Sequence, residues 1–396
     1  MQPSAAQNSR RQKKKMDGKM KLIITGWFCV VLIPPLFGAE NEKSAVGSIS
    51  WKSCLEQKSR FYATDEAIRI ADNVLLFQRD TGGWPKGIDT ARILSEEEKA
   101  KLLKAKSNKD STLDNGATHT QMRYLAKVYN ATKIERFRQA FLNGLDYLLK
   151  AQYPNGGWPQ FYPWQGHAEY SKSITFNDGA MTGAMNVLSD IAEKKPQYAF
   201  VDEDLRKKAE RAVRKGVECI LKCQIIVNGK RTAWCQQYDE KTFEPRPARI
   251  YEKVSICGCE SVDIVRFLIR QTEWRIDNPS PEIVEAIESA VIWFDNAKLA
   301  GIRVVEKPDQ SMERGYDKVV IEDANAPPIW ARFYEIGTNR PIFCGRDGVI
   351  KQSLREIEYE RRTGYAWYGY WPADLLAKDY PAWRKKWTPG KSVLGK

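Results

Sequence analysis

Apolar residues recur at helical spacing in three stretches of the chain, over residues 65–78, 135–152 and 204–224. In the first stretch, one face carries Ala67, Ile68, Ala71, Val74 and Leu75. A period near 3.6 with polar residues between the apolar ones is typical of an amphipathic helix that packs one face on a core. The pattern therefore predicts a helix in each stretch.

Each of these helices runs into a similar turn. Residues 78–85 (QRDTGGWP) recur as residues 152–159 (QYPNGGWP), 74 positions later, and a degraded copy runs from Gln224 through Gly229 to Trp234. Glycine and proline end helices. A repeat of about 75 residues that contains one helix and one turn leaves room for a second helix.

Further helical segments lie between the copies, over residues 115–130, 178–194 and 260–273. Three successive helix pairs predict an all-α dominated fold, a partial α/α toroid in which the inner helices point corresponding ends at one mouth. Past Pro279 the repeat fades. Residues 281–300 predict one more helix, residues 301–323 alternate as strands do, and the rest is rich in aromatic residues, proline and arginine. We expect a smaller C-terminal region of short strands and long loops, and one catalytic domain over residues 61–396.

The N-terminal segment differs from the rest. Residues 22–37 carry no charge and follow Lys19 and Lys21, which is typical of a secretory signal peptide. We predict a signal over residues 1–39, with a possible start at Met16 or Met20, and a linker over residues 40–60. The expected product is a secreted or periplasmic monomer with no stable membrane insertion after processing, because the apolar run is short and is interrupted by prolines.

Charge and composition narrow the chemistry. The formal net charge is +13, of which residues 1–39 hold +6, so the remainder carries +7. That excess suits a polyanionic substrate or simple solubility. Two histidines leave little room for a serine-type triad or a histidine metal site. Seven cysteines follow the signal, and we interpret them as small buried side chains with at most one or two disulfides.

Acidic residues open two of the inner segments. Asp114-Asn115 and Asn177-Asp178 stand at equivalent helix starts. Carboxylate and amide oxygens are the ligands that Ca²⁺ takes, and an incomplete set leaves positions for water and for substrate carboxylates. Asp and Asn are also favoured helix N-caps, which is the alternative for either motif alone. Their repetition favours calcium.

Arginines form the second candidate group. They lie in segments rich in proline and aromatic residues rather than on periodic helix faces, at Arg246, Arg249, Arg332, Arg340 and Arg346. Because a guanidinium binds a carboxylate through two parallel hydrogen bonds, this pattern suits a cleft for uronic acids. Surface ion pairs are the alternative for each arginine. Tryptophans such as Trp84, Trp158, Trp234 and Trp330 either stack on sugar rings or pack in the core.

An ordered set of motifs resembles polysaccharide lyase family 10, the pectate lyases. The motifs are Gly82–Lys86, Asp114–Thr118, Asn155–Gln160, Thr175–Met181, Trp234–Asp239, Ala248–Glu252 and Glu360–Tyr365. The resemblance spans nearly the whole expected mature chain. It implies a partial α/α toroid and a calcium-dependent β-elimination of polygalacturonate, an acidic polysaccharide, with no nucleic-acid partner.

The resemblance also implies roles for residues. Asp114, Asn115 and Asp178 would hold the calcium; Arg249 and Arg332 would bind substrate carboxylates, together with Lys86 and Arg340; Arg346 would be the general base. Free arginine has a pKa above about 12, so a base of this kind predicts an alkaline optimum.

Three other functions fit parts of the pattern. A glycoside hydrolase that uses Asp114 and Asp178 is the enzymatic alternative and would give saturated products. A sugar-binding protein without activity is another. The repeated Q-x-x-x-G-x-W pattern is shared with terpene cyclases, but their aspartate-rich run is absent from the sequence.

Overall fold

The structure is a computed structural model that describes residues 49–274, 279–390 and 393. The chain divides into two units, 1–44 and 45–396, and only the second is described. The predicted signal peptide lies outside the described residues. Within the described ranges, no helix combines the length and the apolar character needed to cross a membrane.

Helices dominate the fold, and the strands are short. The α-helices are α1 (Trp51–Cys54), α2 (Asp65–Phe77), α3 (Glu96–Lys104), α4 (His119–Thr132), α5 (Glu135–Ala151), α6 (Ala180–Ala192), α7 (Glu203–Cys223), α8 (Glu260–Trp274), α9 (Pro281–Ala297), α10 (Tyr359–Gly364), α11 (Trp371–Asp374) and α12 (Tyr380–Trp387). The strands are β1 (Ile174–Thr175), β2 (Ile226–Val227), β3 (Lys230–Arg231), β4 (Gln237–Tyr238), β5 (Ile256–Cys257), β6 (Ile302–Pro308), β7 (Tyr316–Glu322), β8 (Trp330–Ala331), β9 (Phe333–Tyr334), β10 (Phe343–Cys344), β11 (Ile350–Lys351) and β12 (Tyr368–Gly369). Each sheet of the described residues has two antiparallel strands, paired β1–β4, β2–β3, β5–β9, β6–β7, β8–β12 and β10–β11.

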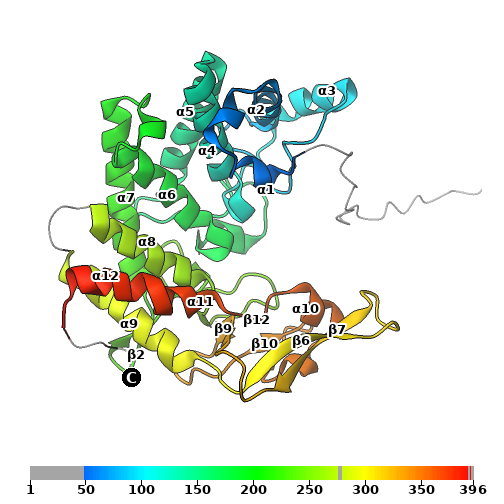
Figure 1. The fold of residues 1–396 in the computed structure, drawn as a ribbon, viewed down its shortest axis with the longest axis vertical. Coiled ribbons are helices and arrows are strands. Elements are labelled where there is room, and N and C mark those ends of the chain that lie inside the picture. The colour runs from blue at the N-terminus through cyan, green and yellow to red at the C-terminus, as the bar shows by residue number, and fades with distance from the viewer. Residues whose placement is uncertain (1–48, 275–278, 391–392, 394–396) are drawn as a thin grey trace, which may run out of the picture. The chain divides into compact units, whose positions relative to one another are not determined.

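The helices pack as consecutive pairs in two rows. Within each pair, α4 contacts α5, α6 contacts α7 and α8 contacts α9. Across the pairs, α4, α6 and α8 contact one another in order and form the inner row, while α5, α7 and α9 form the outer row (Figure 1). This arrangement confirms the predicted partial α/α toroid. The predicted region of short strands and loops follows α9 in the chain.

A glutamine and a tryptophan anchor each repeated turn. The side chain of Gln78 donates to the carbonyl oxygens of Gly82 in its own turn and Ala140 in α5, at 2.8 and 2.9 Å. Gln152 and Gln224 make the equivalent pairs of bonds to their own turns and to the next outer helix. The indole nitrogens donate to carbonyls of the preceding outer helices, from Trp84, Trp158 and Trp234. The three indoles are fully buried, so these tryptophans pack in the core and do not stack on sugar.

A fourth copy of the turn follows α9, where the sequence pattern had faded. Trp330 is buried, and its indole nitrogen donates to the carbonyl oxygen of Phe294 in α9 at 2.8 Å. Tyr334 donates to Ala297 and accepts from the backbone of Ala331, as Tyr238 accepts from the backbone of Cys235. The glycines of the earlier copies are missing here, but the buried tryptophan keeps the same packing.

Residues 49–60, expected in a linker, pack on the helices. Cys54 is fully buried, and the ring of Trp51 lies 5.2 Å from that of Tyr124 in α4. The seven described cysteines are free thiols, six of them buried, and no pair of them forms a disulfide. They are small core side chains, as interpreted from the sequence.

Candidate active site

Two matching turns precede the inner helices α4 and α6. Each is one turn of 3₁₀ helix, over Asp114–Gly116 and Asn177–Gly179. In both, the second residue is left-handed, with φ of 52° at Asn115 and 49° at Asp178. Asn and Asp tolerate this conformation because their short polar side chains bond locally. When the two turns are aligned, Asp114 corresponds to Asn177 and Asn115 to Asp178, so both turns carry one carboxylate and one amide, in opposite order.

Neither turn caps the helix that follows it. α4 begins after Thr118 and α6 after Gly179, and in neither case does a side chain accept a bond from the first turn of the helix. The N-cap alternative for Asp114 and Asp178 is therefore wrong.

Asp114 is buried, with 2% of its surface exposed. Its Oδ2 forms an ion pair of 2.5 Å with Lys86 Nζ and accepts a longer bond of 3.3 Å from Asn115. Its Oδ1 is buried and has no hydrogen-bond partner among the described residues. An unpaired buried carboxylate oxygen is costly, so Asp114 Oδ1 is a candidate ligand position.

Asp178 lies in a field of mixed charge. Burial raises the pKa of its carboxyl, the Arg332 guanidinium opposes this, the charges of Asp114 and Glu260 raise it further, and Arg249 lowers it; the net direction is upward. Arg332 Nη2 lies 3.7 Å from Asp178 Oδ1. Two acidic turns and two arginines thus meet at one place. These are four of the residues to which the resemblance assigned calcium and substrate binding.

Arg332 belongs to a buried polar network. It pairs with Glu260 at the start of α8, and its Nη2 also donates to Asn177 Oδ1 at 3.4 Å. Gln236 donates to the same Asn177 oxygen at 3.0 Å and to Glu260 at 3.2 Å. Glu260 also accepts from the thiol of Cys257. These bonds hold Arg332 against the Asp178 turn.

Arg249 is held differently. Its Nε donates to Glu252 Oε2 at 2.7 Å and its Nη2 to Oε1, while Tyr365 donates to Glu252 Oε1 at 2.7 Å. The guanidinium also stands 4.9 Å from the centre of the Tyr251 ring. Burial alone would lower the pKa of Arg249, but the hydrogen bond and charge of Glu252 raise it overall. The Arg249 side chain remains 41% exposed, whereas Glu252 is 1% exposed.

Arg346 and Arg340 are not bound to this cluster. The Arg346 side chain is 61% exposed and pairs with Glu360 at 2.9 Å, a contact that raises its pKa. Contacts from Glu360 through Arg361 reach the Tyr251 ring, on which Arg249 also stands, so Arg346 lies near Arg249 without a direct bond to it. Arg340 forms an exposed ion pair with Glu335 at 2.9 Å.

Four polar residues near the site occupy the same position in the repeat. Lys86, Gln160, Gln236 and Arg332 each stand two residues after a buried turn tryptophan. Three of the four bond to the acidic turns or to Glu260. Sequence reasoning missed Gln236 and Glu260. The spacing after the tryptophan could have indicated Gln236, and Glu260 is an acidic residue at the predicted start of the third inner segment, over residues 260–273.

A cavity of about 430 Å³ extends from Asp178 among the inner helices. His119, which opens α4, lines it and packs against Gly183 of α6, where a Cβ atom would come within 2.3 Å of its Nε2. Burial lowers the pKa of His119 to about 3, so its ring is neutral near pH 7. In the described part of the chain, no group of three or more His, Cys, Asp or Glu side chains could hold a metal by itself.

The fold and site define the class of the protein: a repeat-built helical enzyme whose inner helix starts set two carboxylates against arginines. Comparison with known proteins agrees. Residues 78–376 match the family model for pectic acid lyase. The chain belongs to this family, and it is a pectate lyase of polysaccharide lyase family 10, as the resemblance implied.

Two solved structures are similar to the chain. One is a family 10 polysaccharide lyase from Cellvibrio cellulosa, with 31% identity and a TM-score of 0.67, covering 84% of this chain and 94% of that one. The other is an aspartate-to-alanine mutant of a family 10 lyase from the same organism in complex with trigalacturonic acid, with 31% identity and a TM-score of 0.69, covering 86% and 99%. A search of curated proteins gives no match.

Proposed function

We propose that the protein cleaves polygalacturonate by calcium-dependent β-elimination to 4,5-unsaturated oligogalacturonides. One observation carries the proposal: Asp114 and Asp178, from matching turns, are close enough for their charges to interact, and Arg249 and Arg332 act on the same carboxyl. The complex of the similar lyase with trigalacturonic acid supports an acidic galacturonate chain as the substrate.

The donor set fits calcium. Asp114 Oδ1 is buried without a partner, and the charge of Asp114 raises the pKa of Asp178. A dication would relieve both unfavourable features, and hard oxygen ligands are those it takes. Asp114, Asp178 and Asn115 would hold it, and the remaining positions would go to water and substrate. When bound, calcium supplies charge neutralisation of the C6 carboxylate, which makes the neighbouring C5 proton more acidic.

The arginines would bind the substrate carboxylate. Arg332, locked by Glu260 and Asn177, presents a fixed positive charge beside Asp178. Such preorganised charge stabilises the negative charge that develops when the C5 proton leaves. Lys86, already paired with Asp114, adds a further positive charge at the other turn.

The base is an arginine with two candidates. Arg346 is the sequence-based one, and it stays a prediction. The geometry supports Arg249 better, because its charge acts on Asp178. Its bonds to Glu252 use Nε and Nη2 and do not involve Nη1. In the reaction the neutral guanidine takes the C5 proton, the C5–H electron pair forms the C4–C5 double bond, and the C4–O bond breaks. The departing oxygen then takes a proton from water.

The test is ultraviolet absorbance of polygalacturonate digests with calcium or with a chelator. We expect product only with calcium, and an alkaline optimum, since the base acts in its neutral form. Arg249→Ala should lower kcat by about 10³-fold or more and Arg346→Ala by much less. Arg136→Ala, which removes an exposed arginine paired with Asp72, is the control. Equal losses in Arg249→Ala and the control would refute the assignment, and a large loss confined to Arg346→Ala would restore the first candidate.

The glycoside hydrolase that the sequence left as an alternative is not supported, because the chain belongs to the pectic acid lyase family.

We further propose that the enzyme works outside the cytoplasm, as a monomer. The uncharged run over residues 22–37 supports export. N-terminal sequencing of the protein from culture medium or periplasm, combined with light scattering, tests both statements.

A further inference from the structure

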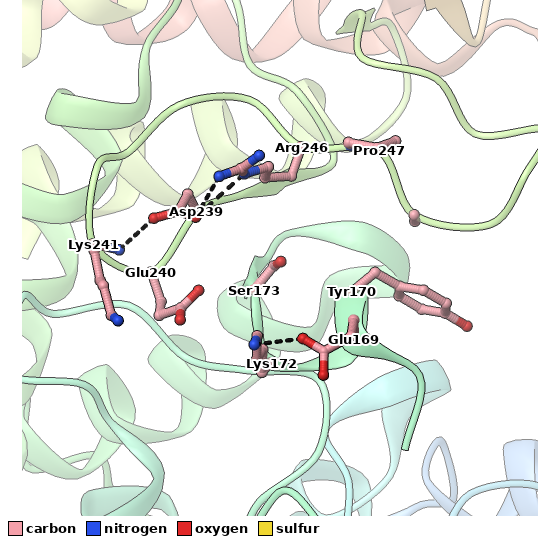
Figure 2. A pocket seen from close by; sticks show the side chains of 10 residues that line it. Glu169, Tyr170, Lys172, Ser173, Asp239, Glu240, Lys241, Arg246 and Pro247 are labelled. Carbon is pink, nitrogen blue, oxygen red and sulfur yellow. Dashed lines mark hydrogen bonds and ion pairs between the residues drawn. The ribbon is translucent and has the colours of Figure 1, made fainter. Parts of the chain in front are cut away.

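A second cavity, of about 570 Å³, lies beside the candidate active site. Figure 2 shows its two walls, one formed by residues 169–173 and the other by the loop over residues 239–248. Pockets of a few hundred Å³ are the size that small ligands occupy. We call this cavity the flanking groove.

Both walls continue directly into the site. Ser173 is followed by β1 and then by the Asn177–Gly179 turn that carries Asp178. Pro247 and Ala248 are followed by Arg249. The strands β1 and β4 pair with each other. β1 connects the first wall to the Asn177–Gly179 turn, and the second wall follows β4 in the chain. A chain bound at Asp178 and Arg249 therefore has the flanking groove next to it.

The lining is mixed in charge and partly fixed. Arg246 donates through Nη2 and Nε to Asp239 Oδ2, at 2.8 and 3.2 Å. Asp239 Oδ1 accepts from the backbone nitrogens of Lys241 and Thr242, both at 2.9 Å. These backbone bonds, followed by the arginine, hold the pKa of Asp239 well below its usual range. Asp239 therefore keeps its charge and holds Arg246 in place through the ion pair, while the Arg246 side chain remains 49% exposed.

The other charged side chains come from both walls. Lys172 pairs with Glu169 at 2.5 Å, and Glu240 and Lys241 point into the groove from the opposite wall (Figure 2). Tyr170 lines the groove at one end, and an aromatic ring can pack on the apolar face of a sugar. A uronic acid residue matches this lining, because it combines a carboxylate for the cations, hydroxyl groups that donate to carboxylates, and an apolar ring face.

We propose that the flanking groove binds a galacturonate residue of the substrate chain, remote from the bond that is cleaved, and so makes the enzyme favour long chains. This inference rests on the proposed function, because it assumes that the neighbouring site holds polygalacturonate. Binding energy from remote parts of a substrate raises the reaction rate of long substrates over truncated ones. The loss of one charge-assisted hydrogen bond corresponds to about a tenfold effect on binding.

The experiment compares kcat/KM on octagalacturonate with kcat/KM on the shortest oligogalacturonate that the wild type cleaves. In Arg246→Ala the ratio of the two should fall about tenfold, and in Tyr170→Ala by about fivefold. The two residues stand on opposite walls, so a shared loss cannot come from a shift of the 239–248 loop alone. Arg136→Ala is the matched control, since Arg136 is also 49% exposed and also donates through Nε and Nη2 to one aspartate.

The outcomes separate the two proposals. Unchanged ratios in both variants overturn the flanking groove while leaving the lyase proposal intact. If the wild type shows no calcium-dependent lyase product, the proposed function fails, and calorimetric titration with octagalacturonate then decides the groove. In that case weaker binding by Arg246→Ala than by Arg136→Ala supports it, and equal affinities overturn it.

Discussion

Glu252 controls both the position and the protonation of Arg249, so Glu252→Gln is the most informative single change. The glutamate accepts from Nε and Nη2 of Arg249, from the Arg249 backbone and from the hydroxyl of Tyr365. Glutamine has nearly the same shape, but it is neutral and replaces one acceptor oxygen with a donor. The variant should therefore fold, with the arginine less firmly held.

The magnitude follows from the contacts. Glu252 raises the pKa of Arg249 because its negative charge stabilises the guanidinium. A charge-assisted hydrogen bond contributes roughly 1.5–3 kcal/mol in protected surroundings. The Arg249 side chain is 41% exposed, and solvent screening reduces the effect, so we take about 1.5 kcal/mol. That is about one pH unit.

The sign is set by the active form of the base. The neutral guanidine accepts the C5 proton, so activity rises as pH climbs toward the pKa of the base. Removing the charge of Glu252 lowers that pKa, and the alkaline rise of kcat/KM in Glu252→Gln should move about one unit toward lower pH.

The assay is kcat/KM against pH, measured by ultraviolet absorbance at saturating calcium. Asp72→Asn is the control, because Asp72 holds Arg136 by the same two nitrogens on the outer helices. A rise that stays at the wild-type pH, or that moves to higher pH, would contradict the reasoning that Arg249 is the base and that Glu252 sets its pKa.

Three further predictions concern stability and metal binding. Arg332→Ala leaves the buried charge of Glu260 without its cation, so the free energy of unfolding should fall by about 3 kcal/mol in chemical denaturation. Arg332→Met combined with Glu260→Gln should recover much of that loss. Asp178→Asn should stabilise the calcium-free protein near pH 7, because burial and the charge of Asp114 raise the folded-state pKa of Asp178 and penalise its ionised form. Calorimetry should show that the same variant loses calcium affinity, and an unchanged affinity would remove Asp178 from the ligand set. His119 has a folded-state pKa near 3 against about 6.5 when unfolded, so the unfolded state binds the proton first and the free energy of unfolding falls as the pH drops from 6.5 toward 3. About 2 kcal/mol of that free energy should be lost between pH 6.5 and pH 5, and His119→Gln should lack this part of the pH dependence.

Much of the fold was predictable from local pattern. Periodicity places α2, α5, α7 and α9 within a few residues of their observed bounds, because helix formation and its termination by glycine and proline depend on neighbouring residues. The fourth turn was not predicted. Its tryptophan packs like the others, but the glycine signal is gone, and a single buried Trp330 has no local signature.

The site divides in the same way. The sequence alone indicated that acidic turns open the inner helices and that Asp114 and Asp178 therefore lie at one mouth, because repetition puts equal positions at equal places. Only the tertiary structure decided which arginines join them. Arg249 and Arg332 are brought in by the loop after β4 and by the fourth turn, and Glu252 and Glu260 hold them there. Arg332 and Arg340 look alike in sequence, because the partner of Arg332, Glu260, is 72 residues away in the chain. Burial and the charge opposite each guanidinium distinguish the two arginines.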